Sequence, residues 1–338
     1  MTIQRDVDLS ARNTLGVTAH ADYWADITDR TQIPELVDWA QARSLPVRVL
    51  GGGSNLVMAP RIRGLVLGMN LRGRQRLDSS DGRLEHWRFQ AGENWHECVR
   101  FSVEQGLSGL ENLALIPGQA GAAPIQNIGA YGVELSDVLV AVDAFDTVEG
   151  RWVRFASKDC DFAYRDSRFK QASNRYIITS IDLELSRDFH PVLDYGPLQS
   201  LKNRDDLTPW TVMDTVISVR QSKLPDPGDI PNAGSFFKNP LVSEEVYRSL
   251  KQRWPELVAY PSGAAWKLAA GWLIDQCGLK GQANASGVGC YDKQALVVVN
   301  PRRADGSEIL DWQRHVQSEV ESTFGVRLER EPRLWNGS

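Results

Sequence analysis

A hydroxyl, an ammonium and an amide group lie close to two phenylalanines in the segment Asn232-Ala-Gly-Ser-Phe-Phe-Lys-Asn-Pro240. A serine held in such an apolar wall can donate a proton to a reacting carbon, and a positioned general acid contributes roughly 10²–10⁴ in rate. Ser235 is therefore a candidate proton donor. The alternative is that Ser235 caps a helix or closes a turn, because serine often does so.

Two further segments carry cations that could hold an anionic group. Tyr164-Arg-Asp-Ser167 contains Arg165, whose planar guanidinium matches a carboxylate or a phosphate in bidentate fashion. A surface Arg–Asp ion pair is the ordinary alternative for this segment. Lys223 precedes a rigid Leu-Pro-Asp-Pro turn, which an ordinary loop would also explain.

Two carboxylates lie two residues apart near the C-terminus. Val326-Arg-Leu-Glu-Arg-Glu331 alternates as a strand would, so Val326 and Leu328 are expected to face inward and Glu329 and Glu331 to share the other face. Such carboxylates are usually solvated. If that face lines a pocket, one of them could assist protonation of a substrate.

Two glycine-rich loops each follow an apolar segment. Residues 46–55 read PVRVLGGGSN, and residues 116–132 read IPGQAGAAPIQNIGAYG. Glycine allows a positive φ and brings bare backbone N–H groups close to an anion. Either loop alone could be a tight turn. Together they predict a chain folded around a long, diphosphate-bearing cofactor, although neither matches the GxGxxG or GxxxxGK[ST] fingerprint.

Hydrophobic periodicity places these motifs on a mixed α and β chain. Helices are expected over residues 34–43, 93–105, 265–277 and 308–324, and strands over 46–50, 64–70, 138–155, 176–187, 294–300 and 326–331, with a hairpin within 72–91. The polar stretch 200–212 with Pro209 indicates a domain junction.

Bulk composition limits the classes of function. The chain has 338 residues, a hydrophobic content of 42% and a net charge of −5, so neither nucleic acid nor an anionic membrane is an expected partner. No apolar run reaches the ~18 residues of a membrane span, and the polar N-terminus predicts a cytoplasmic protein. Four cysteines without CxxC and five histidines without HExxH predict no metal site.

Six motifs occur in an order that resembles the UDP-N-acetylenolpyruvoylglucosamine reductases, flavoenzymes that complete UDP-N-acetylmuramate in peptidoglycan synthesis. The motifs are GGGSN, IPG…IQNIGAYG, YRDS, KLPDP, NAGSFFKNP and AGWLIDQCGLKG. The resemblance extends from about residue 12 to about residue 333. The region around Tyr260 resembles the longer form of the enzyme, in which a tyrosine-bearing loop closes over the substrate.

The resemblance implies an α+β fold, the FAD-binding architecture shared with vanillyl-alcohol oxidase and p-cresol methylhydroxylase. Two subdomains, residues 1–70 and 71–212, would clasp FAD. Residues 213–330 would form a C-terminal α/β substrate-binding domain, and the tail 331–338 would return to the active site. Many relatives of this wider class link the flavin covalently through histidine or cysteine. Neither glycine loop contains histidine, which is consistent with non-covalent FAD.

The resemblance also implies which residues bind the ligands. The FAD diphosphate would lie on the backbone of the first loop, and the second loop would hold the rest of the cofactor. The cofactor-binding candidates are Gly51, Gly52, Gly53, Ser54, Asn55, Pro117, Gly118, Gly121, Ala122, Gln126, Asn127, Gly129, Ala130, Tyr131, Gly132 and Arg220. The substrate-binding candidates are Tyr164, Tyr195, Lys223, Asn239, Tyr260, Lys280 and Gln294.

The implied reaction has two halves. NADPH reduces FAD, and reduced flavin then delivers a hydride from N5 to the vinylic methylene of UDP-N-acetylglucosamine enolpyruvate. Arg165 and Glu331 would stabilise the enolate-like species, and Ser235 would donate the proton. Relatives often read Glu-Pro-Glu-Val-Arg where this chain reads Glu329-Arg-Glu-Pro-Arg333, so Glu329 remains an alternative to Glu331. The choice between NADPH and NADH also stays open.

Two other functions share parts of this pattern. A sugar or lactone oxidase of the same flavoprotein class would carry the glycine loops but would not need NAGSFFKNP or KLPDP. A nucleotide-sugar-binding relative without catalysis would not need Arg165, Ser235 and Glu331 together. The expected partner is a small molecule only, and the expected state is a monomer.

Overall fold

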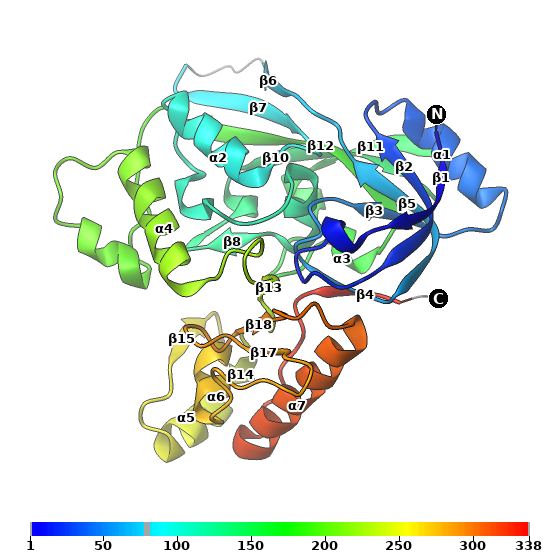
Figure 1. Ribbon diagram of the computed structural model, residues 1–338. Helices are drawn as coiled ribbons and strands as arrows, with labels where there is room; N and C mark the ends of the chain where they lie inside the picture. The colour runs from blue at the N-terminus through cyan, green and yellow to red at the C-terminus, as the bar shows by residue number, and fades with distance from the viewer. Residues whose placement is uncertain (1, 78–81, 337–338) are drawn as a thin grey trace. The chain divides into compact units, whose positions relative to one another are not determined.

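The computed structural model describes residues 2–77 and 82–336. The chain forms two compact units. Unit 1 comprises Met1–Val7, Ala21–Gly52 and Arg63–Ser222, and unit 2 comprises Asp8–His20, Gly53–Ile62 and Lys223–Ser338. Each unit therefore collects segments that are distant in the sequence (Figure 1). The four-part division implied by the resemblance is finer than these two units and stays a prediction.

The first sheet of unit 1 has the strand order β1-β2-β5-β3. Its strands are β1 (Gln4–Asp8), β2 (His20–Ile27), β5 (Arg61–Met69) and β3 (Val47–Leu50). Helix α1 (Gln32–Gln41) buries Ile33 and Leu36 in the same core as Leu65 and Leu67 of β5. This arrangement confirms the helix and the two strands expected over residues 34–70, because one apolar stripe of the helix meets the buried strand.

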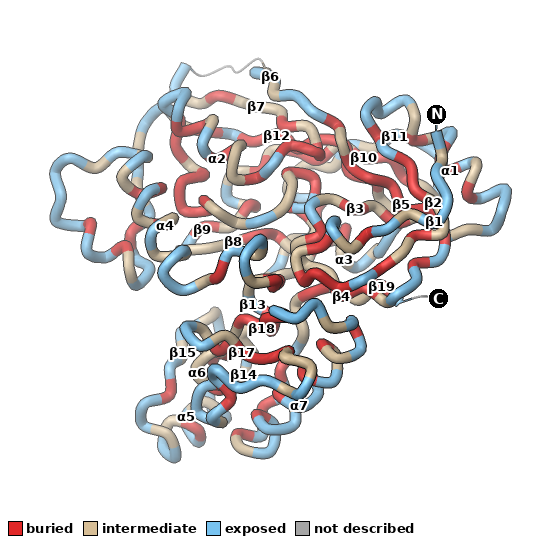
Figure 2. Tube along the Cα trace, viewed as in Figure 1, coloured by how far each residue is buried: buried red, intermediate tan, exposed pale blue. Residues whose placement is uncertain are grey.

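The second sheet of unit 1 has five antiparallel strands in the order β11-β10-β12-β7-β6. They are β6 (Arg74–Leu77), β7 (Leu84–Gln90), β10 (Leu139–Asp146), β11 (Arg151–Ala156) and β12 (Tyr176–Ser186). Figure 2 shows that β10 and β12 are buried along most of their length. The expected hairpin is confirmed as β6 and β7, with part of its turn outside the described residues, and the stretch 138–155 divides into β10 and β11.

Two helices share the core of this second sheet. Helix α2 (Trp95–Glu104) begins at Asn94, whose side chain accepts a hydrogen bond from Glu97 N at 3.1 Å. Gly106 follows the helix with a φ of 71°, the conformation that ends many helices. Helix α4 (Pro209–Lys223) contributes Val212 and Val216 to the same core. The expected helix over residues 93–105 is therefore confirmed.

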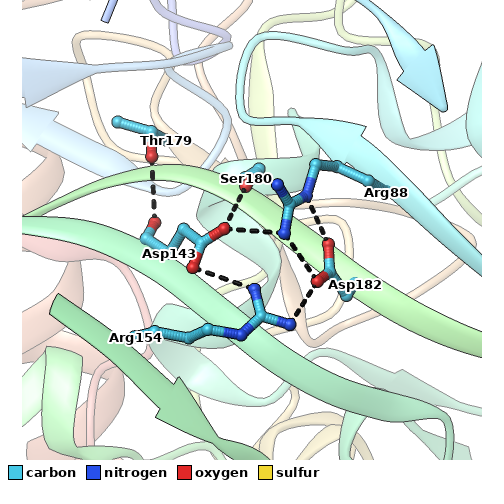
Figure 3. A network of polar contacts seen from close by, with 6 residues as sticks. All are labelled: Arg88, Asp143, Arg154, Thr179, Ser180 and Asp182. Carbon is cyan, nitrogen blue, oxygen red and sulfur yellow. Dashed lines mark hydrogen bonds and ion pairs between the residues drawn. The ribbon is translucent and has the colours of Figure 1, made fainter. Parts of the chain in front are cut away.

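A network of charges ties four neighbouring strands of the second sheet together (Figure 3). Asp182 of β12 is fully buried and accepts hydrogen bonds from Arg88 of β7 at 2.7 and 2.8 Å, and from Arg154 of β11. Asp143 of β10 pairs with both arginines, each at 2.9 Å. Each buried carboxylate oxygen therefore has a cationic donor, which buried charges require.

Unit 2 contains two three-stranded sheets and one pair of strands. The sheets are β13 (Asn232–Ser235), β18 (Val297–Val299) and β17 (Gly289–Cys290), and β14 (Leu241–Ser243), β16 (Ala265–Leu268) and β15 (Ala259–Ser262). The parallel pair is β4 (Leu56–Met58) with β19 (Arg333–Trp335). The helices are α5 (Glu244–Arg253), α6 (Ala270–Gln276) and α7 (Gly306–Phe324). The expected helix over residues 308–324 is confirmed, with Gly325 at a φ of 68° after it.

The structure corrects two predicted elements. The helix predicted over 265–277 is wrong in its first turn, because Ala265–Leu268 forms β16 and is paired on both sides, with β14 and β15. The strand predicted over 326–331 is also wrong. Val326 and Leu328 are buried as the alternation indicates, but only Arg330 forms a bridge, with Phe237, and the final strand begins at Arg333.

Short elements connect these parts. They are the α-helix α3 (Arg168–Gln171), the strands β8 (Gly129–Ala130) and β9 (Val133–Glu134), and the 3₁₀ helices Ser10–Arg12, Glu111–Leu113, Ala120–Gln126, Leu135–Asp137, Ser157–Asp159 and Gly196–Leu201. Within residues 2–77 and 82–336, no helix has both the length and the apolar character needed to cross a membrane.

Candidate active site

The two glycine-rich loops meet in unit 1. A Cβ atom on Gly52 would lie 3.2 Å from Cα of Gly118, so main chain faces main chain with no room for a side chain. A Cβ on Gly51 would lie 2.8 Å from Oε1 of Gln119, and this buried oxygen has no hydrogen-bond partner among the described residues. The expectation that both loops serve one ligand is consistent with this contact. Gln119 was not among the candidates, although it lies inside the second motif.

Two residues of the second loop make hydrogen bonds that fix the conformation of the loop. The backbone N–H of Gly121 donates to Ala91 O at 2.9 Å, and Asn127 Nδ2 donates to Glu134 Oε2 at 2.7 Å. Both residues are buried. Gly121 and Asn127 therefore shape the loop from inside. Exposed or half-buried positions remain at Pro117, Gly118, Ala122, Gln126, Gly129, Ala130, Tyr131 and Gly132.

Arg165 lies in a tight turn with a left-handed backbone. Its φ is 54°, an uncommon conformation for a residue other than glycine, and such strain often occurs at functional sites. Its Nη2 donates to Gly129 O at 2.7 Å, and its guanidinium lies 5.3 Å from the ring of Tyr164. The turn is fixed by Ser167, whose Oγ donates to Ile125 O at 2.7 Å. The turn thus joins the YRDS segment to the second glycine loop.

Arg220 of α4 is desolvated close to Tyr131 and Arg165. Burial lowers the pKa of Arg220, the Tyr131 phenol opposes this shift, and the Arg165 charge adds to it. Its Nε is buried without a hydrogen-bond partner among the described residues. Burial also raises the pKa of Tyr131, whose ring makes an edge contact with Tyr195 at 5.8 Å. A desolvated guanidinium with an unused donor fits an anionic ligand group.

The segments that carry Ser235 and Glu331 pair with each other in unit 2. Ser235 ends β13 and is exposed, whereas the neighbouring Phe236 and Phe237 are fully buried. The backbone N–H of Glu331 donates to Phe236 O at 2.9 Å, so Glu331 lies opposite the residue after Ser235. The phenylalanine side chains anchor this segment in the core and leave the hydroxyl accessible. The structure therefore pairs the main chains of two segments that are 96 residues apart in the sequence and carry Ser235 and Glu331.

Glu329 lies further from Ser235 along the same pairing. Lys238 N donates to Glu329 O at 2.9 Å, and Lys238 Nζ pairs with Glu329 Oε2 at 3.1 Å. The Glu329 side chain is 73% exposed. Its arrangement is that of a surface ion pair, which favours Glu331 as the residue that could act with Ser235.

Within the first glycine segment, the last three residues belong to unit 2. Gly53 has a φ of 62°, and a Cβ there would lie 2.1 Å from Arg12 O, so only glycine fits. Asn55 O accepts from Arg333 N at 2.9 Å. Ser54 is half-buried. The glycine at position 53 is therefore required by packing, and Gly51 and Gly52 remain the accessible ones.

Four of the five remaining substrate candidates of unit 2 lie on or beside α6 and the β14-β16-β15 sheet, and Lys223 does not. Asn239 Oδ1 accepts from Ala270 N at 2.9 Å and so satisfies the first turn of α6. Gln294 Oε1 lies where a Cβ on Gly271 would approach it at 2.8 Å. Tyr260 is 47% exposed on β15, opposite Lys267. Lys280 Nζ lies 3.7 Å from Asp275, and Lys223 is exposed at the end of α4.

The described residues bring no group of three or more His, Cys, Asp or Glu together that could hold a metal ion. The four cysteines are free thiols. Burial raises the pKa of Cys98 and of Cys160 to about 12, so neither is a reactive thiolate.

Comparison with known proteins defines the class first. Residues 21–156 match the family model of an FAD binding domain. This match, the α+β frame and the contact between the two glycine loops identify an FAD-dependent oxidoreductase. The loops, the orphaned Gln119 oxygen and the desolvated Arg220 fit such a cofactor, because FAD brings a diphosphate that suits bare backbone N–H groups and a guanidinium.

The C-terminal part of the chain identifies the family. Residues 226–335 match the model described as UDP-N-acetylenolpyruvoylglucosamine reductase, C-terminal domain. The UDP-N-acetylenolpyruvoylglucosamine reductase of Pseudomonas putida is 43% identical over 99% of this chain and 100% of its own length. That of Bordetella pertussis is 47% identical over 96% of this chain and 93% of its own. The chain belongs to the UDP-N-acetylenolpyruvoylglucosamine reductase family.

A solved structure agrees with this assignment. The reductase from Thermus caldophilus aligns with a TM-score of 0.69 at 26% identity, over 99% of this chain and 100% of that chain. The predicted fold class and family resemblance are therefore confirmed.

Proposed function

We propose that this chain reduces the enolpyruvyl group of UDP-N-acetylglucosamine enolpyruvate to the lactyl ether of UDP-N-acetylmuramate, with NADPH as the hydride donor. The observation that supports the proposal is the backbone hydrogen bond from Glu331 to Phe236, the residue after Ser235, within the region that matches the C-terminal domain of this reductase family. FAD bound to the glycine loops would supply the chemistry of hydride transfer between NADPH and the vinylic methylene carbon of the substrate.

Ser235 is proposed to complete the reduction by donating the Oγ proton to the carbon adjacent to that methylene. Its exposure supports this role, because a proton donor must reach the substrate. The buried phenylalanines that follow it limit its movement. A serine fixed in this way loses little entropy when the substrate binds.

Arg165 and Glu331 are proposed to stabilise the enolate-like species that forms before protonation. The guanidinium of Arg165 offsets the negative charge on the enolate and on the substrate carboxylate. Glu331 can contribute when its carboxyl group carries a proton, because an ionised carboxylate would repel the developing charge. The family resemblance assigns both residues to this reaction.

The ligand contacts follow the same resemblance. Gly51, Gly52, the accessible part of the second loop and Arg220 are proposed to hold FAD. Tyr164, Tyr195, Lys223, Asn239, Tyr260, Lys280 and Gln294 are proposed to hold the UDP sugar. The resemblance also supports a monomeric, cytoplasmic protein that needs no macromolecular partner.

An isotope experiment tests the reaction directly. The full-length protein with FAD is incubated with NADPH and the enolpyruvyl substrate in D₂O, and the product is examined by mass spectrometry and NMR. The proposal predicts one solvent deuterium on the carbon that bears the ether oxygen. A protein that oxidises a sugar or a lactone and passes electrons only to oxygen would instead be the alternative oxidase.

A further inference from the structure

Thr14 joins two functional segments of unit 2 through its main chain. Its backbone N–H donates to Gly53 O at 3.1 Å, and its carbonyl oxygen accepts from Asn232 N at 2.8 Å. Gly53 belongs to the first glycine loop, and Asn232 begins β13, the strand that ends in Ser235. One residue from the N-terminal segment therefore links the proposed diphosphate loop to the strand of the proposed proton donor.

The neighbouring Asn13 makes this link rigid. Asn13 is buried, and its Nδ2 donates to Leu9 O at 3.1 Å and to Val17 O at 2.9 Å. Its Oδ1 accepts from Val17 N at 3.0 Å. A side chain that bonds both ends of a turn holds the turn in one conformation. The backbone of the turn that carries Thr14 is thus held in one conformation.

The hydroxyl of Thr14 is buried and has no hydrogen-bond partner among the described residues. Two other hydroxyls among the described residues are satisfied locally. Thr215 Oγ1 donates to Thr211 O at 2.8 Å, and Ser102 Oγ donates to Val99 O at 2.7 Å. A buried hydroxyl that makes no bond is costly, and in a native structure it needs an explanation, such as a ligand that completes it.

We propose that Thr14 is a cofactor-binding residue whose Oγ1 donates a hydrogen bond to a phosphate oxygen of FAD. This assignment depends on the proposed function only in one respect, which is that the chain must bind FAD. An anionic oxygen suits the hydroxyl because a charge-assisted hydrogen bond repays the burial of the donor. The adjacent Gly53 cannot carry a side chain, since a Cβ there would lie 2.1 Å from Arg12 O. Thr14 then supplies a side-chain donor where the glycine loop offers only main chain.

The alternative is that Thr14 only fills space, and a pair of variants separates the two. Thr14→Val removes the hydroxyl and keeps the shape, and Thr14→Ser keeps the hydroxyl. Thr18→Val is the matched control, because Thr18 is exposed in the same segment. For each full-length protein, freed of flavin, the Kd for FAD is measured by the change in flavin fluorescence, and the midpoint of thermal unfolding is measured without flavin.

The proposal predicts that Thr14→Val binds FAD roughly tenfold or more weakly, since a bond to a charged group is lost. Its flavin-free midpoint should equal or exceed that of wild type, because an unsatisfied hydroxyl has been removed. Thr14→Ser and Thr18→Val should keep FAD affinity near wild type. Unchanged affinity in Thr14→Val, or a lower flavin-free midpoint that accounts for the weaker binding, would overturn the assignment alone. A wild-type chain that binds no FAD would overturn the proposed function with it.

Discussion

Glu331 donates its backbone N–H to the carbonyl oxygen of Phe236 at 2.9 Å, which fixes the C-terminal segment against the strand that ends in Ser235. The sequence leaves Glu329 and Glu331 as alternatives, and the structure places them in different surroundings. Glu331 pairs with Phe236, which directly follows Ser235. Glu329 lies beside Lys238, with which it forms an exposed ion pair at 3.1 Å.

The two glutamates should therefore respond differently to the same substitution. Glu331→Ala should slow reoxidation of reduced flavin by the enolpyruvyl substrate roughly 10²-fold, the scale for loss of one transition-state contact. Glu329→Ala removes only a surface pair and should leave this rate near wild type. Single-turnover kinetics of both variants makes the comparison. The reverse pattern would transfer the role to Glu329.

Loss of the Ser235 hydroxyl should affect one half-reaction only. Ser235→Ala should slow flavin reoxidation by the substrate by roughly 10²–10⁴, the range for a positioned general acid. Reduction of the flavin by NADPH needs no proton from this serine and should be unchanged. Stopped-flow absorbance of each half-reaction measures both rates. Unchanged reoxidation in Ser235→Ala would rule out this serine as the acid.

The contact between the glycine loops predicts an effect on cofactor affinity. In Gly52→Ala the new Cβ would lie 3.2 Å from Cα of Gly118, so the two loops must separate by a few tenths of an ångström. FAD affinity should fall, because the backbone N–H groups move from their binding positions. Gly82→Ala is the control, since a Cβ there has no neighbour within 4 Å. Fluorescence titration with FAD compares the two variants. Equal affinities would contradict the proposed role of the two glycine loops in binding FAD.

The charge network of the second sheet predicts a pH-dependent stability. Burial alone would raise the pKa of Asp182, but hydrogen bonds from Arg88 and Arg154 outweigh it, and the pKa is lowered. Asp182→Asn should lower the free energy of unfolding by about 3 kcal/mol near neutral pH, at the low end for a broken buried pair because Arg154 is 47% exposed and can turn to solvent.

The sign of the pH effect follows from the lowered pKa. A carboxylate of this kind contributes stability above its unfolded pKa, near 3.8, and loses it as the pH falls through the folded value. The difference between wild type and Asp182→Asn in urea unfolding should thus shrink below about pH 4. Asp206→Asn, in an exposed pair with Arg204, is the control and should show little difference at any pH. A difference independent of pH would contradict the network's role.

The periodic elements could be predicted from the sequence because local pattern and tertiary packing agree there. The apolar stripe of α7, which includes Ile309 and Phe324, is read directly from helical spacing. The helix predicted over residues 265–277 was wrong in its first turn because local pattern and tertiary packing disagree there. Its apolar pattern suits a helix, but Ala265–Leu268 is held by hydrogen bonds to two strands, which override local preference.

The sequence singles out candidate site residues where a motif carries its own chemistry, as at Ser235 and Arg165, and their roles stay predictions. It does not single out residues whose proposed role depends on distant main-chain contacts. Thr14 is an ordinary threonine in the sequence, and only its bonds to Gly53 and Asn232 draw attention to it. Gln119 lies within the second glycine motif, and its side chain is not distinctive until Gly51 is seen beside it.

The most direct test of the account is anaerobic stopped-flow spectroscopy of the purified protein with FAD. The flavin is first reduced with NADPH and then mixed with UDP-N-acetylglucosamine enolpyruvate while the absorbance near the flavin maximum is followed. The account predicts rapid return of the oxidised flavin spectrum with formation of UDP-N-acetylmuramate. A flavoprotein that is reduced but whose flavin stays reduced in the presence of this substrate would contradict the proposed reaction.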